Sequence, residues 1–365
     1  MKTILYPLLL ISFHLLKAQD SISHRVIFIG DAGEINSAQQ KVISEATHYI
    51  IKDKTTAIFL GDNIYPRGMG LPNSPEEAET KKILQSQYVP FRSQDIPVYF
   101  IPGNHDWDRS GKLGLQKIKA QSVFLQQQQD AFLKLIPTNG CPDPSVIPIS
   151  ESLIIIAFDS EWWLHPFEKD SPDSVCTCNT QKEIIEKLNE LFYANKDKMI
   201  LLTSHHPFQS YGSHGGYFSW KDHLFPLTAA NKNLYIPLPV IGSLYPILRN
   251  TFVNPQDIRH PLYQDMIKQI DEVFEGFPNM VHVAGHEHSL QLIQNKQLQV
   301  VSGAGAKKTF VKKGKDALFG KETNGFVTAD ELINKAVRFT FYELKNNRLQ
   351  IAFTFTKPYQ KYTND

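Results

Sequence analysis

Five short apolar segments of this chain each end in a turn that begins with Gly or Ser and carries Asp, Asn or His. These turns hold Asp31, Asp62, Asn104, His205, and the pair His286 and His288. In α/β sheets, ligands gather beyond the carboxyl ends of the strands, so side chains from such turns can converge on one crevice. The pattern therefore predicts an α/β chain whose strands share one functional edge.

The first third of the chain repeats a strand, a turn and a helix three times. The predicted strands are 24–29, 57–60 and 97–101, and the predicted helices are 37–50, 75–91 and a Gln-rich segment that runs to about residue 135. Ser37 and Gln40 offer a capping box for the first of these helices, whose apolar residues keep helical spacing. This alternation is typical of parallel strands joined by helices.

The rest of the chain contains more strand than helix. The predicted strands are 153–158, 199–203, 280–284, 298–301, 337–343 and 349–355, and the predicted helices begin at about Thr180 and Gln256. Residues 208–255 are rich in Tyr, Phe, Pro and Gly without periodicity, which favours an ordered loop region over a site rather than a linker. We therefore expect one domain over residues 24–365, in which the strands between 337 and 355 close a sheet.

The balance of charged residues argues against a nucleic-acid partner. Lys and Arg together number 38 and Asp and Glu number 37, so the net charge gives no attraction for a polyanion. The chain has 365 residues, of which 42% are hydrophobic, and this is enough to bury a large core. A negatively charged ligand would therefore have to be held by local groups.

The N-terminus has the pattern of a secretory signal peptide over residues 1–18. A basic start is followed by an apolar stretch from Ile4 to Leu16, which is too short to span a bilayer, and by the small residue Ala18. No Asn-x-Ser/Thr sequon is present, so the sequence offers no sign of a eukaryotic secretory route. We expect a secreted or periplasmic bacterial protein that has no membrane segment after cleavage.

Three cysteines, Cys141, Cys176 and Cys178, follow the predicted signal peptide. In an oxidising compartment we expect one disulfide and one remaining thiol, but the sequence does not choose among the three possible pairings. A zinc site built from these thiols is disfavoured, because no fourth Cys or His lies nearby.

The residue types in the five turns are those of a metal site. Carboxylate, amide and imidazole ligands suit Zn, Fe or Mn. The Asp62 carboxylate has two oxygens and can bridge two ions, and Tyr65, three residues later, can supply a phenolate to one of them. Each turn alone is common in proteins that bind no metal, so this interpretation depends on the recurrence of the pattern.

Taken together, the turns resemble those of the calcineurin-like metallophosphoesterases, and within them the small, tartrate-resistant purple acid phosphatases. The five matching blocks are Gly30-Asp31-Ala32-Gly33, Gly61-Asp62-Asn63-Ile64-Tyr65, Gly103-Asn104-His105-Asp106, Ser204-His205-His206-Pro207 and Gly285-His286-Glu287-His288. The resemblance covers roughly residues 24 to 310 and implies an α/β fold, a four-layer αββα sandwich of two mixed β-sheets flanked by helices.

The resemblance also implies a binuclear metal centre of Fe(III) plus a divalent ion (Fe, Zn or Mn). By position, the ferric ligands are Asp31, Asp62, Tyr65 and His288, and the divalent ligands are Asp62, Asn104, His205 and His286. Most metallophosphoesterases carry a histidine where this chain has Gly33, and Tyr65 replaces that imidazole with an anionic oxygen, which suits Fe(III).

Three further residues are candidates for catalysis. His105 follows the ligand Asn104, and His214 lies nine residues after His205 (214 − 205 = 9), the offset at which the family places a histidine that faces the substrate. Asp106 is expected to orient His105 rather than to bind metal. His206 is a poorer candidate ligand than His205, because adjacent residues at a strand end point to opposite faces.

The function that the resemblance implies is that of a secreted acid phosphatase, a phosphoric monoester hydrolase. A metal-bound hydroxide would attack a small phosphate ester while His105 or His214 protonates the leaving oxygen. A phosphodiesterase or nucleotide pyrophosphohydrolase on the same site is an alternative, and a catalytically weak metal-containing binding protein is another. We expect a monomer with a small-molecule substrate and no nucleic-acid partner.

Overall fold

The computed structural model describes residues 21–169, 176–229, 234–239, 241–251 and 253–362, which form two seven-stranded β-sheets. The first sheet has the spatial order β14 (Arg348–Lys357), β13 (Val337–Lys345), β12 (Gly325–Leu332), β1 (Ile22–Ile29), β2 (Thr55–Phe59), β3 (Val98–Phe100) and β4 (Leu133–Leu135). The second has the order β11 (Ala317–Lys321), β9 (Leu290–Gln294), β10 (Leu298–Ser302), β8 (Met280–Ala284), β7 (Met199–Ser204), β6 (Leu153–Ala157) and β5 (Ser145–Pro148).

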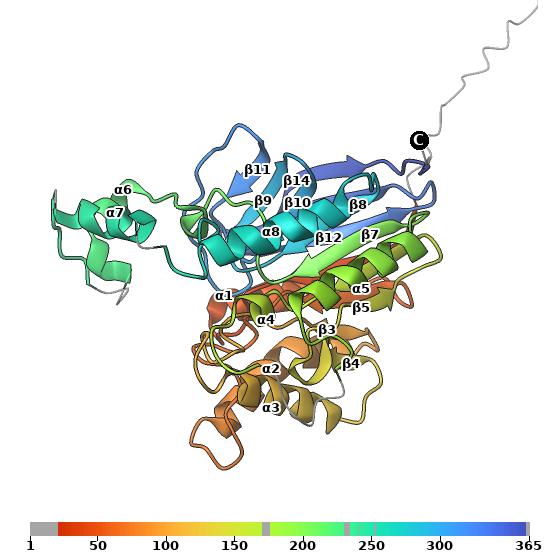
Figure 1. The fold of residues 1–365 in the computed structure, drawn as a ribbon, viewed down its shortest axis with the longest axis horizontal. Coiled ribbons are helices and arrows are strands. Elements are labelled where there is room, and N and C mark those ends of the chain that lie inside the picture. Colours follow the sequence, from red (N-terminus) through yellow and green to blue (C-terminus); the bar gives the residue numbers. More distant parts are fainter. Residues whose placement is uncertain (1–20, 170–175, 230–233, 240, 252, 363–365) are drawn as a thin grey trace, which may run out of the picture.

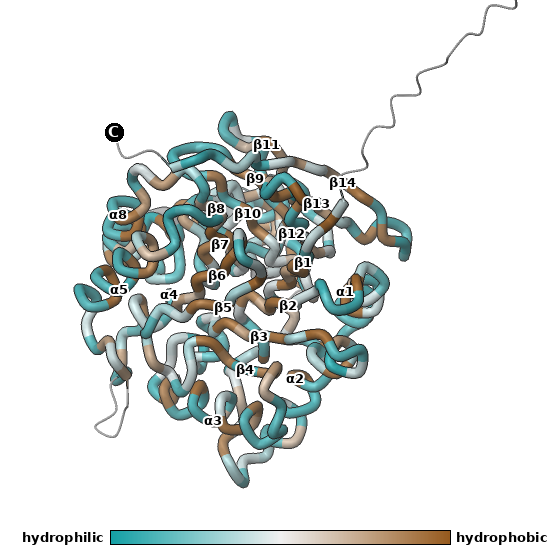
Figure 2. The backbone as a smooth tube through the Cα atoms, turned by 90° about the vertical axis from the view of Figure 1, so that its right-hand side faces the viewer, coloured by the Kyte–Doolittle hydropathy of each residue, from teal (hydrophilic) through white to brown (hydrophobic). Residues whose placement is uncertain are grey.

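Helices cover the outer faces of the two sheets, as Figures 1 and 2 show. The α-helices are α1 (Ser37–Thr47), α2 (Glu77–Arg92), α3 (Gly114–Gln126), α4 (Ser160–Leu164), α5 (Gln181–Ala194), α6 (Trp220–Leu224), α7 (Leu244–Thr251) and α8 (Pro261–Phe274). Short 3-10 helices are η1 (Thr138–Gly140), η2 (Ser213–Gly215), η3 (Pro226–Ala229) and η4 (Ile241–Ser243). The predicted sandwich of two mixed β-sheets flanked by helices is confirmed.

Alternation along β1 explains why the two sheets stack. Val26 and Phe28 are buried in the core that joins the two sheets, whereas Ile27 and Ile29 are buried in the core shared with the helices. A strand with apolar residues on both faces cannot lie at a surface, and it must be covered on both sides. The sequence of β1 therefore places it in the interior of a layered fold.

Caps set where two of the helices begin. Thr180 and Glu183 form the predicted capping box of α5, since each side chain accepts a hydrogen bond from the other residue's backbone N–H. The capping box predicted at Ser37 is wrong by one position. The cap of α1 is Asn36, whose Oδ1 accepts from the backbone N–H groups of Ala38 (3.1 Å) and Gln39 (2.9 Å), and Ser37 is the first helical residue.

Other expectations about single elements are corrected by the structure. The Gln-rich helix, α3, ends at Gln126, and the following segment forms β4 rather than more helix. The region 208–255 contains helices α6 and α7, which project from one end of the sandwich in Figure 1. The helix expected from Gln256 is α8, which begins at Pro261 after the cap His260.

The predicted signal peptide over residues 1–18 lies outside the described residues. Within the described ranges, none of the helices combines the length and the apolar character that a bilayer-spanning segment needs.

A disulfide joins Cys141 to Cys176, and Cys178 remains a buried free thiol. Burial raises the pKa of this thiol to about 11, so it is a poor nucleophile. This is one of the three pairings that the sequence allows. Since two of the three sulfurs are in the disulfide, the cysteines form no thiolate cluster for zinc.

The disulfide is expected to stabilise the fold. It links positions separated by 35 residues, so the Cys141→Ser, Cys176→Ser double variant should lose about 3 to 4 kcal/mol of unfolding free energy in urea. A reducing agent should lower the stability of the wild-type protein to that of the double variant and leave the variant unchanged. Equal stability of the oxidised wild type and the double variant would contradict this.

Candidate metal centre

The carboxyl ends of strands from both sheets meet at one place. β1, β2 and β3 lead into the turns of Asp31, Asp62 and Asn104, and β7 and β8 lead into those of His205 and His286. Backbone hydrogen bonds join the turns, from Gly30 N–H to the carbonyl of Ser302 (2.7 Å) and from Gly285 N–H to that of His205 (3.0 Å). The two sheets therefore bring their turns together at one place.

Glycine is required where these turns touch. Gly61 has a φ of 87°, in the left-handed region that favours glycine, and a Cβ there would overlap the ring of His205. A Cβ on Gly103 would overlap the backbone and carboxylate of Asp62. The glycines that open the turns thus allow neighbouring loops to approach closely enough for their polar side chains to share one centre.

The first donor group surrounds the hydroxyl of Tyr65. This oxygen lies 3.0 Å from Asp31 Oδ1, 3.0 Å from Asp62 Oδ2 and 3.1 Å from His288 Nε2. His288 Nε2 is also 3.3 Å from Asp31 Oδ1. All four residues that the sequence assigned to the ferric ion therefore point their donor atoms at one spot.

The second donor group surrounds Nε2 of His205. This nitrogen lies 3.1 Å from Asn104 Oδ1, 3.4 Å from Asp62 Oδ1 and 3.1 Å from Nδ1 of His286. Asp62 therefore turns one carboxylate oxygen toward each group, which is the geometry that a bridging ligand needs. The structure brings together every residue that the sequence assigned to the second ion.

Hydrogen bonds outside the centre orient the imidazoles. Nδ1 of His205 donates to the carbonyl oxygen of Leu60 (2.8 Å), and Nε2 of His286 donates to that of Gln256 (2.9 Å). In each ring the remaining nitrogen then carries the lone pair and faces the other donors. This arrangement is typical of histidines that ligate metals.

His206 lies close to the second group without the same freedom. Its nitrogens lie near those of His205 and His286, but Nδ1 is 2.8 Å from the Ser160 hydroxyl and Nε2 is 2.7 Å from Oε1 of Gln256. Both ring nitrogens thus have polar partners outside the centre. His205, in contrast, turns Nε2 toward Asn104 and Asp62. That His205 is the better ligand stays a prediction.

Burial without a cation perturbs the acid groups of the centre. Desolvation, reinforced by the charge of Asp62, raises the pKa of Asp31 to about 8. Burial and the two carboxylates raise the pKa of the Tyr65 phenol well above its usual value. Burial lowers the pKa of His288 to about 4 and leaves it a neutral donor. These residues fit a highly charged cation, which stabilises the anionic carboxylates and phenolate that burial alone opposes.

Strained backbone accompanies the candidate ligands. Asp31, Asp62 and His286 have φ angles of 57°, 53° and 68°, which are uncommon for residues other than glycine. Strain of this kind persists only where the surrounding structure imposes it, and it gathers at functional sites.

The structure places His105 at the edge of the centre and changes the role expected for Asp106. Nδ1 of His105 donates to the carbonyl oxygen of Pro66 (2.6 Å), and Nε2 lies 3.9 Å from Asp62 Oδ2. It is therefore Pro66 that orients the ring. Asp106 instead accepts from the backbone N–H groups of Gly103 (2.8 Å) and Asn63 (3.1 Å), so its carboxylate ties the Asn104 turn to the Asp62 turn.

His214 reaches the centre from the loop after β7. Its ring lies against that of His286, with centroids 3.9 Å apart and the planes tilted by 39°, and Nδ1 lies 3.0 Å from Asp257 Oδ1. Burial opposes its charge, but the hydrogen bond to Asp257 and the charge of Glu287 outweigh this and raise the pKa of His214. The side chain is 21% exposed, so it is neither free in solvent nor sealed in the core.

Sequence reasoning missed four residues that shape the site. Asp257 and Gln256 precede α8, and they hold His214 and His286. Glu287 is fully buried and accepts a hydrogen bond from the backbone N–H of His214 (2.7 Å), which fixes the loop that carries His214. The only sign of Glu287 in the sequence is its position between the candidate ligands His286 and His288. Lys307 lies over the Tyr65 ring, and no motif points to it.

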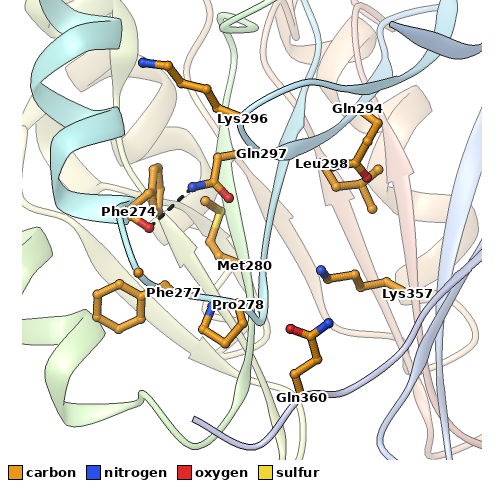
Figure 3. Close-up of a pocket in the computed structure, with 11 residues that line it drawn as sticks. Phe274, Phe277, Pro278, Met280, Gln294, Lys296, Gln297, Leu298, Lys357 and Gln360 are labelled. Atoms are coloured by element: carbon orange, nitrogen blue, oxygen red, sulfur yellow. Dashed lines mark hydrogen bonds between the residues drawn. The ribbon is translucent and has the colours of Figure 1, made fainter. Parts of the chain in front are cut away.

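A pocket at the other end of the second sheet is separate from this centre. Figure 3 shows residues that line it, among them Phe274, Phe277, Met280 and Lys357. Met280 opens β8, whereas His286 follows the end of the same strand. The pocket therefore lies at the amino end of the strand and takes no part in the chemistry of the centre.

The two sheets and the converging carboxylate, amide and imidazole groups form an α/β sandwich with one candidate metal centre. The sequence model of the calcineurin-like phosphoesterase family matches residues 24–236, and the chain belongs to this family. The family is one of hydrolases, and the histidine and aspartate groups of the centre are suitable for metal. A search of curated protein sequences finds no significant match.

The fold is shared with many solved structures, among them these two. The purple acid phosphatase PPD1 from yellow lupin (Lupinus luteus) seeds has a TM-score of 0.54 at 12% identity over 93% of this chain and 54% of its own, so this chain spans about half of its length. GAP50, the anchor in the inner membrane complex of Plasmodium, has a TM-score of 0.52 at 16% identity over 93% of this chain and 90% of its own.

Proposed function

We propose that this protein is an exported, monomeric phosphomonoesterase with a binuclear metal centre of the purple acid phosphatase type. The observation that supports the proposal most directly is the position of Asp62, whose two carboxylate oxygens face two separate donor groups. Asp31, Tyr65 and His288 would hold a ferric ion with Asp62. Asn104, His205 and His286 would hold a divalent Fe, Zn or Mn ion with it.

When bound, the two ions would neutralise the phosphate and lower the pKa of a coordinated water. The chain's own contribution is orientation and proton transfer. His105 and His214 each use Nδ1 for a protein partner, so Nε2 is the nitrogen left for the substrate. Burial lowers the pKa of His105, while Asp257 and Glu287 raise that of His214. Their opposite shifts favour His214 as the proton donor to the leaving oxygen.

The proposal is tested by loading the protein with iron and a second metal and comparing an aryl phosphomonoester with the corresponding diester. We expect faster monoester turnover and a visible tyrosinate-to-iron band that disappears in Tyr65→Phe. Faster diester turnover would favour the phosphodiesterase alternative. Zinc or manganese as the sole metal would contradict the ferric assignment, and two bound metals without turnover of any phosphate ester would favour a binding protein.

The pairing of His214 with Asp257 predicts a change in the pH profile. Because Asp257 helps to raise the pKa of His214, the acid form persists to higher pH in the wild-type protein than it would alone. In Asp257→Asn the pKa falls, so kcat/KM for the monoester should decline at a lower pH. The control is Asp265→Asn, on the exposed face of α8. If the alkaline limb of the pH profile does not move in Asp257→Asn, His214 is not the general acid.

A further inference from the structure

Lys307 places a cation against the candidate metal centre. Its Nζ lies 3.0 Å from the centroid of the Tyr65 ring, and its side chain is only 18% exposed. The ammonium group also forms an ion pair with Glu34 (3.3 Å). The next residue, Lys308, is exposed. Lys307 is therefore directed inward, while its neighbour has the ordinary position of a surface lysine.

The backbone on both sides of Lys307 is anchored to the metal-site turns. Before it, Ala306 N–H donates to the carbonyl oxygen of Asp31 (3.1 Å). After it, Thr309 N–H donates to the carbonyl oxygen of His288 (2.7 Å). The segment thus bridges two turns that carry candidate ligands of the ferric ion. These contacts hold the backbone on both sides of Lys307 close to the centre.

The negative charges that face Lys307 are those of Glu34 and of the candidate ligands Asp31 and Asp62. Metal ions bound by the two ligand carboxylates would offset that part of the attraction, because like charges repel the ammonium group. Solvent screens the part that comes from Glu34, since its side chain is 41% exposed. A phosphate group bound at the centre would add negative charge, and a lysine can approach its oxygens as a point charge.

We propose that Lys307 binds the phosphoryl group of the substrate and makes the centre selective for dianionic phosphomonoesters over monoanionic phosphodiesters. This inference rests on the proposed function and adds a residue that the family's motif blocks do not contain. A monoester carries close to two negative charges at neutral pH, because the second pKa of a phosphate is about 6. The electrostatic attraction of Lys307 for it is therefore about twice that for a diester.

Phosphate affinity tests the inference directly. Inorganic phosphate is titrated calorimetrically into the metal-loaded wild-type, Lys307→Ala, Lys307→Arg and Lys308→Ala proteins. Loss of a charge-assisted hydrogen bond predicts that the Kd for phosphate rises about 10- to 100-fold in Lys307→Ala. Lys307→Arg should recover part of the affinity, and Lys308→Ala should match the wild type. Equal phosphate affinity in Lys307→Ala and Lys308→Ala would overturn the inference.

Selectivity gives a second, independent readout. The ratio of kcat/KM for the aryl monoester to that for the diester should fall about tenfold in Lys307→Ala and stay constant in Lys308→Ala. Equal loss on both esters, or loss of metal from Lys307→Ala, would show that the lysine only supports the centre and would overturn the inference. A wild-type protein that binds phosphate but hydrolyses neither ester would instead refute the proposed function, and the phosphate titration would still decide on Lys307.

Discussion

An Asp62→Asn variant is expected to remain folded but to lose metal and about 10³-fold or more of its phosphomonoesterase activity. The carboxylate faces both donor groups, so its replacement weakens both sites at once. The transition-state stabilisation that two metals provide amounts to several kcal/mol, and about 4 kcal/mol corresponds to 10³-fold in rate.

Asparagine is the right substitution because the position is strained. Asp62 has a φ of 53°, which Asn tolerates better than most residues do. Its Oδ1 can still accept the hydrogen bond from the backbone N–H of His105 (2.9 Å in the wild-type protein). The substitution thus removes the charge and preserves the turn. Metal analysis of the purified variant and its circular dichroism spectrum measure the two effects separately.

Asp53→Asn provides a matched control. Asp53 has a φ of 60° but lies in an exposed turn before β2, at the other end of that strand from Asp62. This variant should keep two metals and wild-type turnover. A folded Asp62→Asn protein that also retained two equivalents of metal would show that Asp62 is not a bridging ligand and would remove the main support for the binuclear proposal.

Removal of the metals by a chelator is expected to abolish hydrolysis and to lower the melting temperature by at least about 5 °C. Ions that bind only the folded state stabilise it, and the loss of about 3 kcal/mol of such binding energy shifts the transition of a large domain by several degrees. Iron together with a divalent metal should restore both properties. An unchanged melting temperature after complete removal would mean that the donor groups are stable as a structural network without metal.

The stability of the chelated protein should also depend on pH in a way that the loaded protein's does not. In the metal-free fold, the pKa of Asp31 is raised to about 8, whereas the carboxyl of the unfolded chain titrates near 3.8. The folded state therefore holds the extra proton, and stability falls as the pH rises toward 8. Burial lowers the pKa of His288 from 6.5 to about 4, so below pH 6.5 this residue makes the stability rise with pH and opposes the effect of Asp31. The decline should thus be visible between pH 6.5 and 8.

The ligand turns were predictable from the sequence because each one is local. An apolar strand, a glycine and a polar side chain lie within a few residues of one another, and the parallel strands bring such turns to one edge. The same reasoning failed for β12. This strand reads Gly-Phe-Val-Thr-Ala-Asp-Glu-Leu, and two adjacent acids are unusual in a buried strand. The bidentate contact of Arg25 with Asp330 (2.6 and 2.8 Å) makes this burial possible, and Arg25 is distant in sequence.

The sequence by itself determined the α/β layering and the residue types that face one crevice, since both follow from local patterns of apolar and polar residues. Tertiary structure decided which ring nitrogen of His205 and His286 faces the other candidate ligands, because the second nitrogen of each ring donates to the carbonyl oxygen of Leu60 or Gln256. It also decided that Asp257 holds His214 and that Lys307 lies on Tyr65. These contacts join residues far apart in the chain, so they have no local pattern by which a sequence could show them.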